Sequence, residues 1–402
     1  MREALLRAGF NEAASRADWI IVNSCTVTRD SDRKTFYYMR RFRKANPRAR
    51  IILAGCVTEK NSTDELLGKG ADIIIRNTEK RDIARLIQQA VSPGRVPDTP
   101  QPLMNISFFK GHTRAFIKIQ DGCGMRCSYC KVTLVRGESR SRDSGAVVEE
   151  AGRLAANGYK EIVLTGVQLG AFGKERGGES RLGDLLSRLA RVPGLERIRL
   201  SSIEPFDMPD DVIEALCTNP LLCPHLHLPL QSGDDSLLRR MRRPYTAAHY
   251  IDLINRICAR VPRFGLTTDV IVGFPGETEE AFENTKKVLE LTRPFKIHIF
   301  PFSPREGTEA YGLEGRVPSS VIKKREKELS ALNDELFRST SLPLTGTRAR
   351  VLVEKSDILK KRAEGRLSDY RSARISGYQG NAGDVADVTV TGIARDHLVA
   401  EA

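Results

Sequence analysis

The feature that most constrains the fold of this chain is a pattern that repeats six times between about residues 106 and 330. Each unit has a short apolar run, typical of a buried strand, followed by an amphipathic helical stretch such as "TAAHYIDLINRICARV". Six such units predict an incomplete barrel of parallel strands, whose functional edge lies at the carboxyl ends of the strands. The predicted strands are 115–123, 161–167, 197–203, 225–231, 267–274 and 295–302.

The flanking segments predict two further domains, so the expected fold class is α/β with three domains. Residues 1–91 alternate buried strands ("DWIIVNSC", "RIILAGC", "ADIII") with helical patterns, which indicates a small doubly wound α/β domain. Residues 92–105 are rich in Pro and Gly and predict a linker to the barrel domain, 106–340. Residues 341–402 show short alternating strands with Gly and Asn turns, which predict a small antiparallel β-barrel.

The composition narrows the class of protein. The 402 residues are 40% hydrophobic and 29% charged, and no apolar run approaches the roughly 20 residues of a membrane span. The start "MREALLRAGF" is an amphipathic helix rather than a secretory signal. Eight cysteines without a disulfide-like pattern fit a reducing compartment, so we expect a cytoplasmic protein. The net charge of +13 favours a polyanionic partner but is weak evidence alone.

The stretch "DGCGMRCSYC" places Cys123, Cys127 and Cys130 in one short loop, immediately after the first barrel strand. Three thiolates at this spacing can hold a 4Fe–4S cluster and leave one iron open for another ligand. Zinc is the alternative, but structural zinc sites take four ligands, usually as two separated pairs. His112 is the nearest fourth candidate, and it lies before the strand. The spacing therefore favours the iron–sulfur cluster.

A CxxxCxxC loop at the end of the first strand of a partial barrel resembles the radical S-adenosylmethionine (SAM) enzymes. The resemblance implies that the open iron chelates SAM, and that an electron from the cluster cleaves SAM to a 5′-deoxyadenosyl radical. It also implies that residues at the ends of the later strands help to seat SAM. These residues are Thr165 and Gly166 in "LTGV", Glu204 in "SSIEP", Gln231 in "PLQSG", and Asp269 and Gly273 in "DVIVGFPGE".

Cys25 and Cys56 form a second pair, because each ends a predicted strand of the N-terminal domain. The carboxyl ends of parallel strands lie along one edge of a sheet, so the two thiols can approach each other there. From the residues alone, two ordinary buried cysteines remain the simpler interpretation. The other three cysteines, Cys217, Cys223 and Cys258, are expected in the core of the barrel region.

A wider resemblance changes the interpretation of Cys25 and Cys56. The segments "NSCTVTRDSDRKT", "AGCV", "HLHLPLQSG", "GFPGET" and "IHIFPFSPREGT" follow one another as in the methylthiotransferases, whose C-terminal barrel is a TRAM domain. In that family three cysteines of the N-terminal domain hold an auxiliary 4Fe–4S cluster, and two of them correspond to Cys25 and Cys56. The third precedes a helix like "REALLRAGF", inside which this chain begins. We therefore expect a longer natural product; the alternative is a form defective in sulfur insertion.

Within this family, "SSIEP", "HLHLPLQSG" and "PFSPREGT" are most similar to the branch that modifies N6-threonylcarbamoyladenosine in tRNA. Residues 29–50 carry nine Lys and Arg against two Asp, and such charge suits phosphate neutralisation. The C-terminal segment has ten Lys and Arg against eight Asp and Glu, so a role in RNA binding there is only implied by resemblance. The residues expected to bind RNA are Arg136, Arg140, Arg142, Arg242 and Arg243.

The expected reaction follows from the resemblance. The radical removes hydrogen from C2 of the adenosine beside the anticodon, the auxiliary cluster delivers sulfur, and SAM supplies the methyl group. No side chain is assigned as a general acid or base. Expected partners are the tRNA anticodon stem-loop and an electron donor such as flavodoxin or ferredoxin, with the enzyme as a monomer and without a membrane. Alternatives are isopentenyladenosine in tRNA, a ribosomal protein as substrate, and a non-catalytic Fe–S RNA-binding protein.

Overall fold

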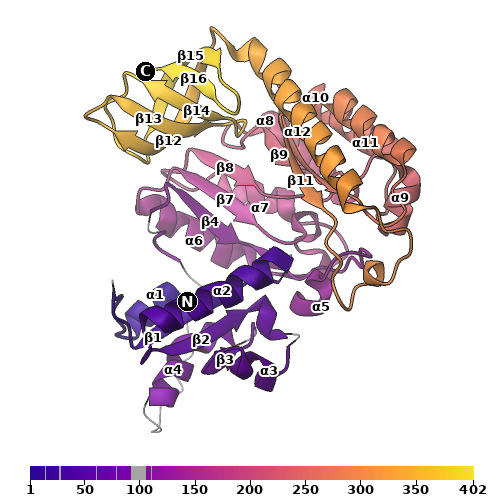
Figure 1. Ribbon diagram of the computed structural model, residues 1–402. Coiled ribbons are helices and arrows are strands. Elements are labelled where there is room, and N and C mark those ends of the chain that lie inside the picture. Colours follow the sequence, from indigo (N-terminus) through magenta and orange to yellow (C-terminus); the bar gives the residue numbers. More distant parts are fainter. Residues whose placement is uncertain (14, 27–28, 60, 78, 92–105, 110) are drawn as a thin grey trace. The chain divides into compact units, whose positions relative to one another are not determined.

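The structure is a computed structural model, and it divides the chain into two compact units (Figure 1). The N-terminal unit comprises Met1–Ile106, Tyr129–Gly137 and Ser303–Tyr311, and the C-terminal unit comprises the remainder. The predicted linker at 92–105 falls outside the described residues, and the three-domain limits stay a prediction. The structure describes residues 1–13, 15–26, 29–59, 61–77, 79–91, 106–109 and 111–402.

The N-terminal unit is built on a three-stranded parallel sheet in the order β1–β2–β3, with helices on both faces. In the central strand, Ile51 and Leu53 pack with Met39 and Leu66 on one face. The alternate residues Ile52 and Ala54 pack with Ile83 and Ile87 on the other, which confirms a doubly wound α/β arrangement. The elements are α1 (Arg2–Arg7), β1 (Trp19–Ser24), α2 (Arg29–Ala45), β2 (Arg50–Gly55), η1 (Cys56–Glu59), α3 (Thr63–Gly68), β3 (Ile73–Ile75), α4 (Ile83–Val91) and α5 (Val132–Arg136).

Six parallel strands form the main sheet of the C-terminal unit, as the sequence predicts. They pair as β4–β7–β8 and β9–β10–β11. Isolated parallel bridges, Ile198 with Leu222 and Ser202 with His227, connect the two halves into one curved sheet. The arrangement is the expected partial barrel. Its strands are β4 (Arg114–Lys118), β7 (Glu161–Thr165), β8 (Arg197–Leu200), β9 (His225–His227), β10 (Gly265–Val272) and β11 (Lys296–Pro301).

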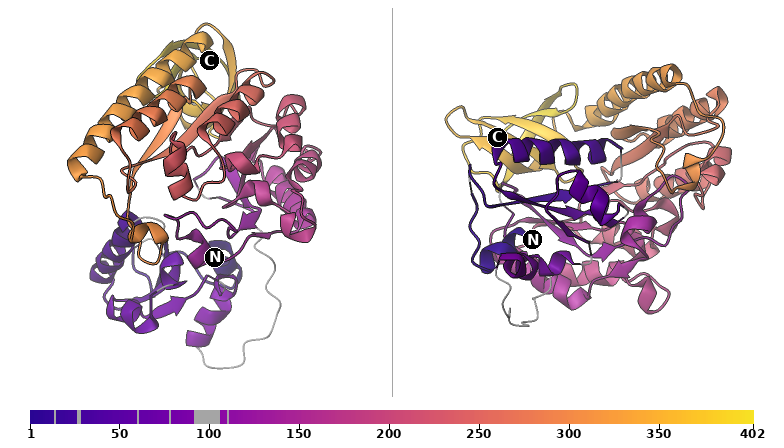
Figure 2. Two further views of the ribbon diagram at one scale, coloured as in Figure 1. Left: turned by 90° about the vertical axis from the view of Figure 1, so that its right-hand side faces the viewer. Right: turned by 60° about the horizontal axis from the view of Figure 1, so that its bottom comes forward.

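Helices cover the outer side of this sheet, and several start at a side chain that accepts a backbone N–H, as Asp143, Thr246 and Thr278 do. Helices α10, α11 and α12 lie next to one another (Figure 2). Among the described residues, no helix combines the length and the apolar character needed to cross a membrane. The helices are α6 (Ser144–Ala156), α7 (Leu182–Leu189), α8 (Asp210–Thr218), α9 (Asp235–Arg240), α10 (Ala247–Cys258), α11 (Glu279–Thr292) and α12 (Ser319–Ser341).

The C-terminal segment closes into a five-stranded barrel in the order β12–β13–β14–β16–β15, with its own apolar core. Inward residues of β15, namely Ala386, Val388 and Val390, alternate with exposed ones, which is the pattern that predicts the barrel. The pairing is antiparallel except between β14 and β16, which run parallel. Its strands are β12 (Arg348–Asp357), β13 (Arg362–Leu367), β14 (Ser372–Ser376), β15 (Val385–Ile393) and β16 (Leu398–Glu401).

The loop between β13 and β14 covers the amino ends of the six parallel strands. Arg199 of β8 donates to the carbonyl oxygen of Ser368 at 2.9 Å, and the Tyr370 ring stacks on His225 with 4.6 Å between centroids. Below this loop, Glu161 forms ion pairs with Arg197 and Arg199 at 3.5 and 2.8 Å. The amino end of the barrel is therefore closed by the C-terminal segment, and its carboxyl end is left for a site.

Candidate functional site

Each of the three clustered cysteines presents a half-buried sulfur that receives an N–H group. The backbone N–H of Met125 points to the Cys123 sulfur at 3.3 Å, and that of Val132 to the Cys130 sulfur at 3.4 Å. The guanidinium of Arg243 donates to the Cys127 sulfur at 3.4 Å. All eight cysteines lie in the described part, and none forms a disulfide. N–H donors stabilise thiolates, so the surroundings of each sulfur suit a ligand of a 4Fe–4S cluster.

Arg243 links the Cys127 sulfur to Glu204. It is buried, forms an ion pair with the Glu204 carboxylate, and contacts the Tyr245 hydroxyl at 3.3 Å. Burial raises the pKa of Tyr245 to about 12, so this hydroxyl stays protonated. Arg243 was expected to bind RNA, but the structure places it in the interior beside the cysteine loop. Glu204, expected to contact SAM, is oriented by this arginine.

Gln120 fixes the loop that follows β7. Its side-chain oxygen accepts the backbone N–H groups of Val167 and Gln168, both at 2.8 Å, and its amide donates to the carbonyl of Gly122 at 2.8 Å. A side chain at Gly166 would meet the Gln120 oxygen at 3.0 Å, which explains the glycine in "LTGV". The predicted SAM-binding loop and the cysteine loop are therefore held by one buried amide.

Gln168 adds a direct contact to this group. Its amide oxygen lies 3.4 Å from the Cys123 sulfur, and its amide nitrogen donates to Asp207 at 3.0 Å. Lys174 forms an ion pair with the same Asp207. Thr165, which was expected to help seat SAM, directs its hydroxyl to the Ile117 carbonyl at 3.3 Å. The loop after β7 thus connects the first cysteine to a polar network.

The remaining predicted SAM residues lie on β10 and its neighbours. Gln231 has a φ of 64° and bridges to Val270, and its N–H donates to the Asp269 carbonyl at 2.8 Å. The Asp269 Oδ1 atom lies 3.1 Å from His227 Nε2. Gly273 has a φ of 79°, and a side chain there would meet Ile322 at 2.5 Å. Asp269 and Gly273 are therefore placed by strand pairing and by packing within the barrel.

Cys25 and Cys56 leave neighbouring strands at the same level, because their preceding residues Ser24 and Gly55 are paired in the sheet. Gly55 has a φ of 108°, and a side chain there would meet the Ser24 carbonyl at 2.2 Å. The Asn77 amide lies 3.7 Å from the Cys56 sulfur, while Cys25 is exposed. The two predicted auxiliary ligands therefore follow paired residues at one edge of the sheet, and their binding of a cluster stays a prediction.

Arg305, in the segment that joins the N-terminal unit, fixes the loop after β1. It is buried and donates to the Thr26 carbonyl at 2.8 Å and to the Thr26 hydroxyl at 3.0 Å. It also forms an ion pair with Asp32 on α2. Because Thr26 follows Cys25 directly, Arg305 positions the exposed cysteine.

The other arginines expected to bind RNA differ in exposure. Arg140 and Arg242 are exposed, and Arg136 is half-buried on α5. Arg142 forms an ion pair with the buried Glu150 at 2.7 Å and donates to the Lys118 carbonyl at 3.0 Å. Arg142 therefore supports the strand ends, and Arg140 and Arg242 are the exposed members of the predicted set.

Sequence reasoning missed Gln120, Gln168, Asn77 and Arg305. A signal was present in each case: Arg305 lies within "PFSPREGT", and Gln120, Gln168 and Asn77 lie within two residues of "DGCGMRCSYC", "LTGV" and "ADIII". Among the three cysteines expected in the core, Cys223 is buried, Cys217 is half-buried, and Cys258 is exposed. The expectation for Cys258 was wrong because it ends α10, where the buried face of the helix is formed by residues such as Leu253 and Ile257.

Comparison with known proteins gives two family matches. Residues 117–289 match the radical SAM superfamily, and residues 1–76 match the family described as uncharacterized protein family UPF0004. The chain is 36% identical to threonylcarbamoyladenosine tRNA methylthiotransferase MtaB of Chlamydia pneumoniae, over 88% of this chain and 82% of that protein. It is 38% identical to the protein of the same name from Thermotoga maritima, with the same coverage.

A second group of relatives carries another name. The tRNA-2-methylthio-N(6)-dimethylallyladenosine synthase of Frankia alni is 32% identical, over 96% of this chain and 81% of that protein. Among solved structures, the radical SAM methyltransferase TsrM of Kitasatospora setae has a TM-score of 0.55 at 16% identity, covering 75% of this chain and 66% of that one. This last likeness concerns the fold alone.

Proposed function

The chain belongs to the radical SAM methylthiotransferases, and from this membership we propose that it adds a methylthio group to C2 of N6-threonylcarbamoyladenosine in tRNA, next to the anticodon. The observation that carries the proposal is identity of 36–38% to proteins of that name over 88% of the chain. The donor N–H groups at all three clustered sulfurs support it from the structure.

The cofactors of such an enzyme are SAM and two 4Fe–4S clusters, which supply the radical and the sulfur when bound. Cys123, Cys127 and Cys130 would hold the first cluster, and Cys25 and Cys56 would contribute to the second. This chain's own residues keep the sites in shape: Gln120 holds the two loops together, Arg243 places Glu204, and Arg305 places Cys25.

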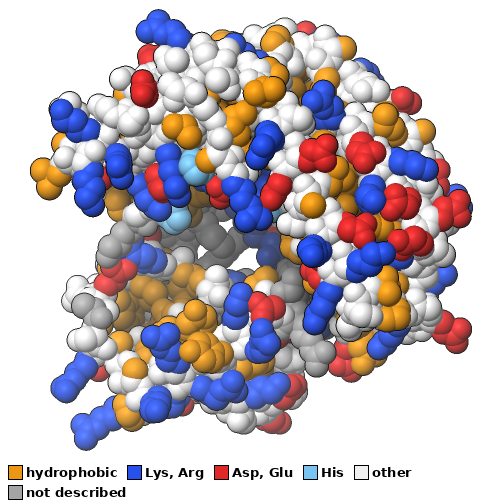
Figure 3. All heavy atoms as spheres, turned by 45° about the horizontal axis from the view of Figure 1, so that its top comes forward, with side chains coloured by type: hydrophobic (Ala, Val, Ile, Leu, Met, Phe, Trp, Pro, Cys, Tyr) orange, Lys and Arg blue, Asp and Glu red, His pale blue; other side chains and the backbone are white. Residues whose placement is uncertain are grey.

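An exposed face of α2 supports binding of an anticodon stem-loop. Tyr37, Tyr38 and Phe42 are 51%, 44% and 36% exposed and lie among the exposed Arg40 and Arg41. The Tyr38 and Phe42 rings stack, with 5.9 Å between centroids. Figure 3 shows basic and hydrophobic side chains beside one another on the surface of the N-terminal unit. Aromatic rings between cations suit loop nucleotides, whose bases stack and whose phosphates need neutralisation.

The α2 face can be tested by Tyr38→Ala, which should weaken binding of the stem-loop by about 1–3 kcal/mol, or roughly 5- to 150-fold. Leu6→Ala is the control within the same unit, because Leu6 is 40% exposed on α1, which packs on the opposite face of the sheet from α2. Fluorescence anisotropy with a labelled stem-loop measures both. Equal affinities for Tyr38→Ala and the wild type would remove α2 from the proposed RNA surface.

The activity itself is tested with anaerobically reconstituted protein, SAM, a reductant such as reduced flavodoxin, and stem-loops carrying threonylcarbamoyladenosine. Nucleoside mass spectrometry should detect the 2-methylthio product, and 5′-deoxyadenosine should form with it. Cys127→Ala should abolish both products, whereas Cys56→Ala should abolish only the nucleoside product. Cys258→Ala removes an exposed thiol outside these sites and should change neither. A Cys127→Ala protein that still cleaves SAM would refute the assignment of the first cluster.

Relatives of the second group favour one other substrate, because they match 96–99% of this chain at 31–33% identity. A parallel stem-loop carrying N6-isopentenyladenosine separates the two. If the methylthio product forms only on this second stem-loop, N6-isopentenyladenosine replaces N6-threonylcarbamoyladenosine as the assigned substrate. Size-exclusion chromatography of the reconstituted protein tests the accompanying proposal of a monomer.

A further inference from the structure

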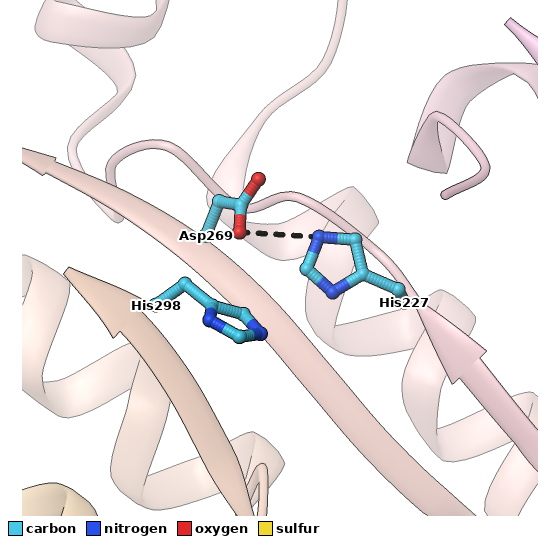
Figure 4. A group of neighbouring side chains, drawn as sticks. All are labelled: His227, Asp269 and His298. Atoms are coloured by element: carbon cyan, nitrogen blue, oxygen red, sulfur yellow. Dashed lines mark ion pairs between the residues drawn. The ribbon is translucent and has the colours of Figure 1, made fainter. Parts of the chain in front are cut away.

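Three neighbouring strands of the partial barrel place two histidines and one aspartate together. His227 ends β9, Asp269 lies in β10, and His298 lies in β11 (Figure 4). Asp269 and His298 are paired in register, so their side chains leave the sheet on the same side. One potential ligand atom from each residue lies within 4.8 Å of those of the other two. The cluster contains none of the cysteines and lies within the C-terminal unit alone.

The donor types are those that bind a transition metal. Two imidazole nitrogens and one carboxylate oxygen form a common protein ligand set for zinc and related divalent ions. His227 Nε2 and Asp269 Oδ1 are 3.1 Å apart, a separation that two ligands of one small cation also adopt. In Figure 4 the His227 ring is directed at the Asp269 carboxylate, and the His298 ring lies on the neighbouring strand beside both.

The second nitrogen of His227 is also held, as is usual for a metal-binding histidine. Its Nδ1 lies 2.9 Å from the Thr267 hydroxyl, which also contacts His225 Nε2 at 3.1 Å. A hydroxyl can accept a hydrogen bond from His227 Nδ1–H, and this fixes the ring with Nε2 free to bind an ion. Thr267 is buried, so the orientation is enforced from the interior of the sheet.

The cluster is partly accessible to solvent. The side chains of His227 and Asp269 are 17% and 24% exposed, and His298 is more exposed than either. Three protein ligands with an open side are typical of zinc sites that take a further ligand, whereas structural sites are closed by four.

We propose that His227, Asp269 and His298 bind one divalent transition-metal ion of the zinc class, with one coordination position open to a small oxygen or nitrogen ligand. The site goes beyond the proposed methylthiolation and does not depend on it. It also gives Asp269 a role different from the predicted contact with SAM.

Zinc chloride is the probe for this site. Protein with reconstituted iron–sulfur clusters is dialysed anaerobically against buffered zinc, and zinc and iron per chain are measured by inductively coupled plasma mass spectrometry. We expect one zinc per chain in the wild type with no loss of iron. His298→Ala and Asp269→Asn should each weaken zinc binding by more than about 100-fold, because they remove a ligand, and Thr267→Val should weaken it by about 10- to 100-fold.

His249→Ala is the matched control, since His249 is an exposed histidine of α10 outside the cluster. It should bind zinc as the wild type does. Asp269→Asn keeps the shape of the side chain, so it remains informative if His298→Ala does not fold. Wild-type affinity in both cluster variants, no zinc in the wild type, or zinc taken up only as iron is lost would each overturn the proposal. One combination of results would return Asp269 to the SAM site. In that case the wild type binds no zinc, and Asp269→Asn keeps its iron but loses SAM binding.

Discussion

The two ends of the six-stranded barrel each carry a buried arginine paired with a glutamate, yet the pairs differ in their surroundings. At the amino end, Arg199 is paired with Glu161, and both side chains are nearly inaccessible to solvent. At the carboxyl end, Arg243 is paired with Glu204, whose side chain is 19% exposed. The same two residue types therefore form one ion pair that is fully buried and another that is partly exposed to solvent.

The difference lies in what satisfies the remaining donors. Arg199 gives its other N–H groups to the carbonyls of Leu367 and Ser368, so the C-terminal segment completes this pair. Arg243 instead gives an N–H to the Cys127 sulfur. A pair completed by backbone carbonyls can only stabilise the fold, whereas a pair that ends at a cysteine sulfur can influence a bound cluster.

The largest expected effect is on stability at the amino end. Glu161→Gln leaves Arg197 and Arg199 buried without their anion, and it should lower the free energy of unfolding by about 3–5 kcal/mol. Anaerobic urea denaturation measures this, and Glu149→Gln, at an exposed position of α6, is the control. SAM cleavage by the folded protein should be unchanged. Equal stability of Glu161→Gln and the wild type would contradict the structural role of this pair.

The carboxyl end should respond in activity rather than in stability. Arg243→Met removes a positive charge and a donor from the Cys127 sulfur, so SAM cleavage should fall by about 10- to 100-fold. The midpoint potential of the cluster, followed by electron paramagnetic resonance, should become more negative, because a nearby cation favours the reduced cluster. Arg243→Lys should restore part of both.

Arg256→Met is the control for this measurement, because Arg256 is an exposed arginine of α10 that pairs with Asp210. It should leave the cleavage rate and the potential unchanged. An Arg243→Met protein with wild-type potential and lowered stability would place Arg243 in the same structural class as Arg199.

The pH dependence of stability sharpens the comparison further. Burial alone would raise the pKa of Glu161, but Arg199 and Arg197 outweigh it and hold the pKa below the usual 4.5. A carboxyl with a lowered pKa in the folded protein contributes stability above its ordinary pKa and loses it as the pH falls through the lowered value. The stability difference between the wild type and Glu161→Gln should therefore be full at pH 6 and shrink below about pH 4.5. A difference that stays constant down to pH 3 would rule out this linkage.

The smallest expected effect concerns an exposed pair. Lys355 and Glu364 are 3.3 Å apart on the surface of the C-terminal barrel, with side chains 80% and 47% exposed. Lys355→Met removes only this pair and should change the free energy of unfolding by less than about 1 kcal/mol, since solvent screens it. Urea denaturation in parallel with Glu161→Gln gives the contrast. A loss of unfolding free energy as large as that caused by Glu161→Gln would show that solvent exposure does not explain the difference between the two ion pairs.

Much of the fold follows from the sequence because its signals are local. Alternating strands and helices predicted both sheets, and the short alternating strands at the end predicted the C-terminal barrel. The position of the clustered cysteines after the first barrel strand also follows from the chain alone. These features depend on periodicity and spacing, which neighbouring residues determine.

Other features depend on residues far apart in the chain. Arg243 lies in a basic stretch that suggests a surface for RNA, and only the tertiary structure buries it against Cys127, 116 positions earlier. The strands likewise bring His227, Asp269 and His298 together, although none is close to another in sequence. The sequence by itself determined the elements and the ligand types. The tertiary structure decided which polar groups meet, because burying a charge requires a partner that only folding can supply.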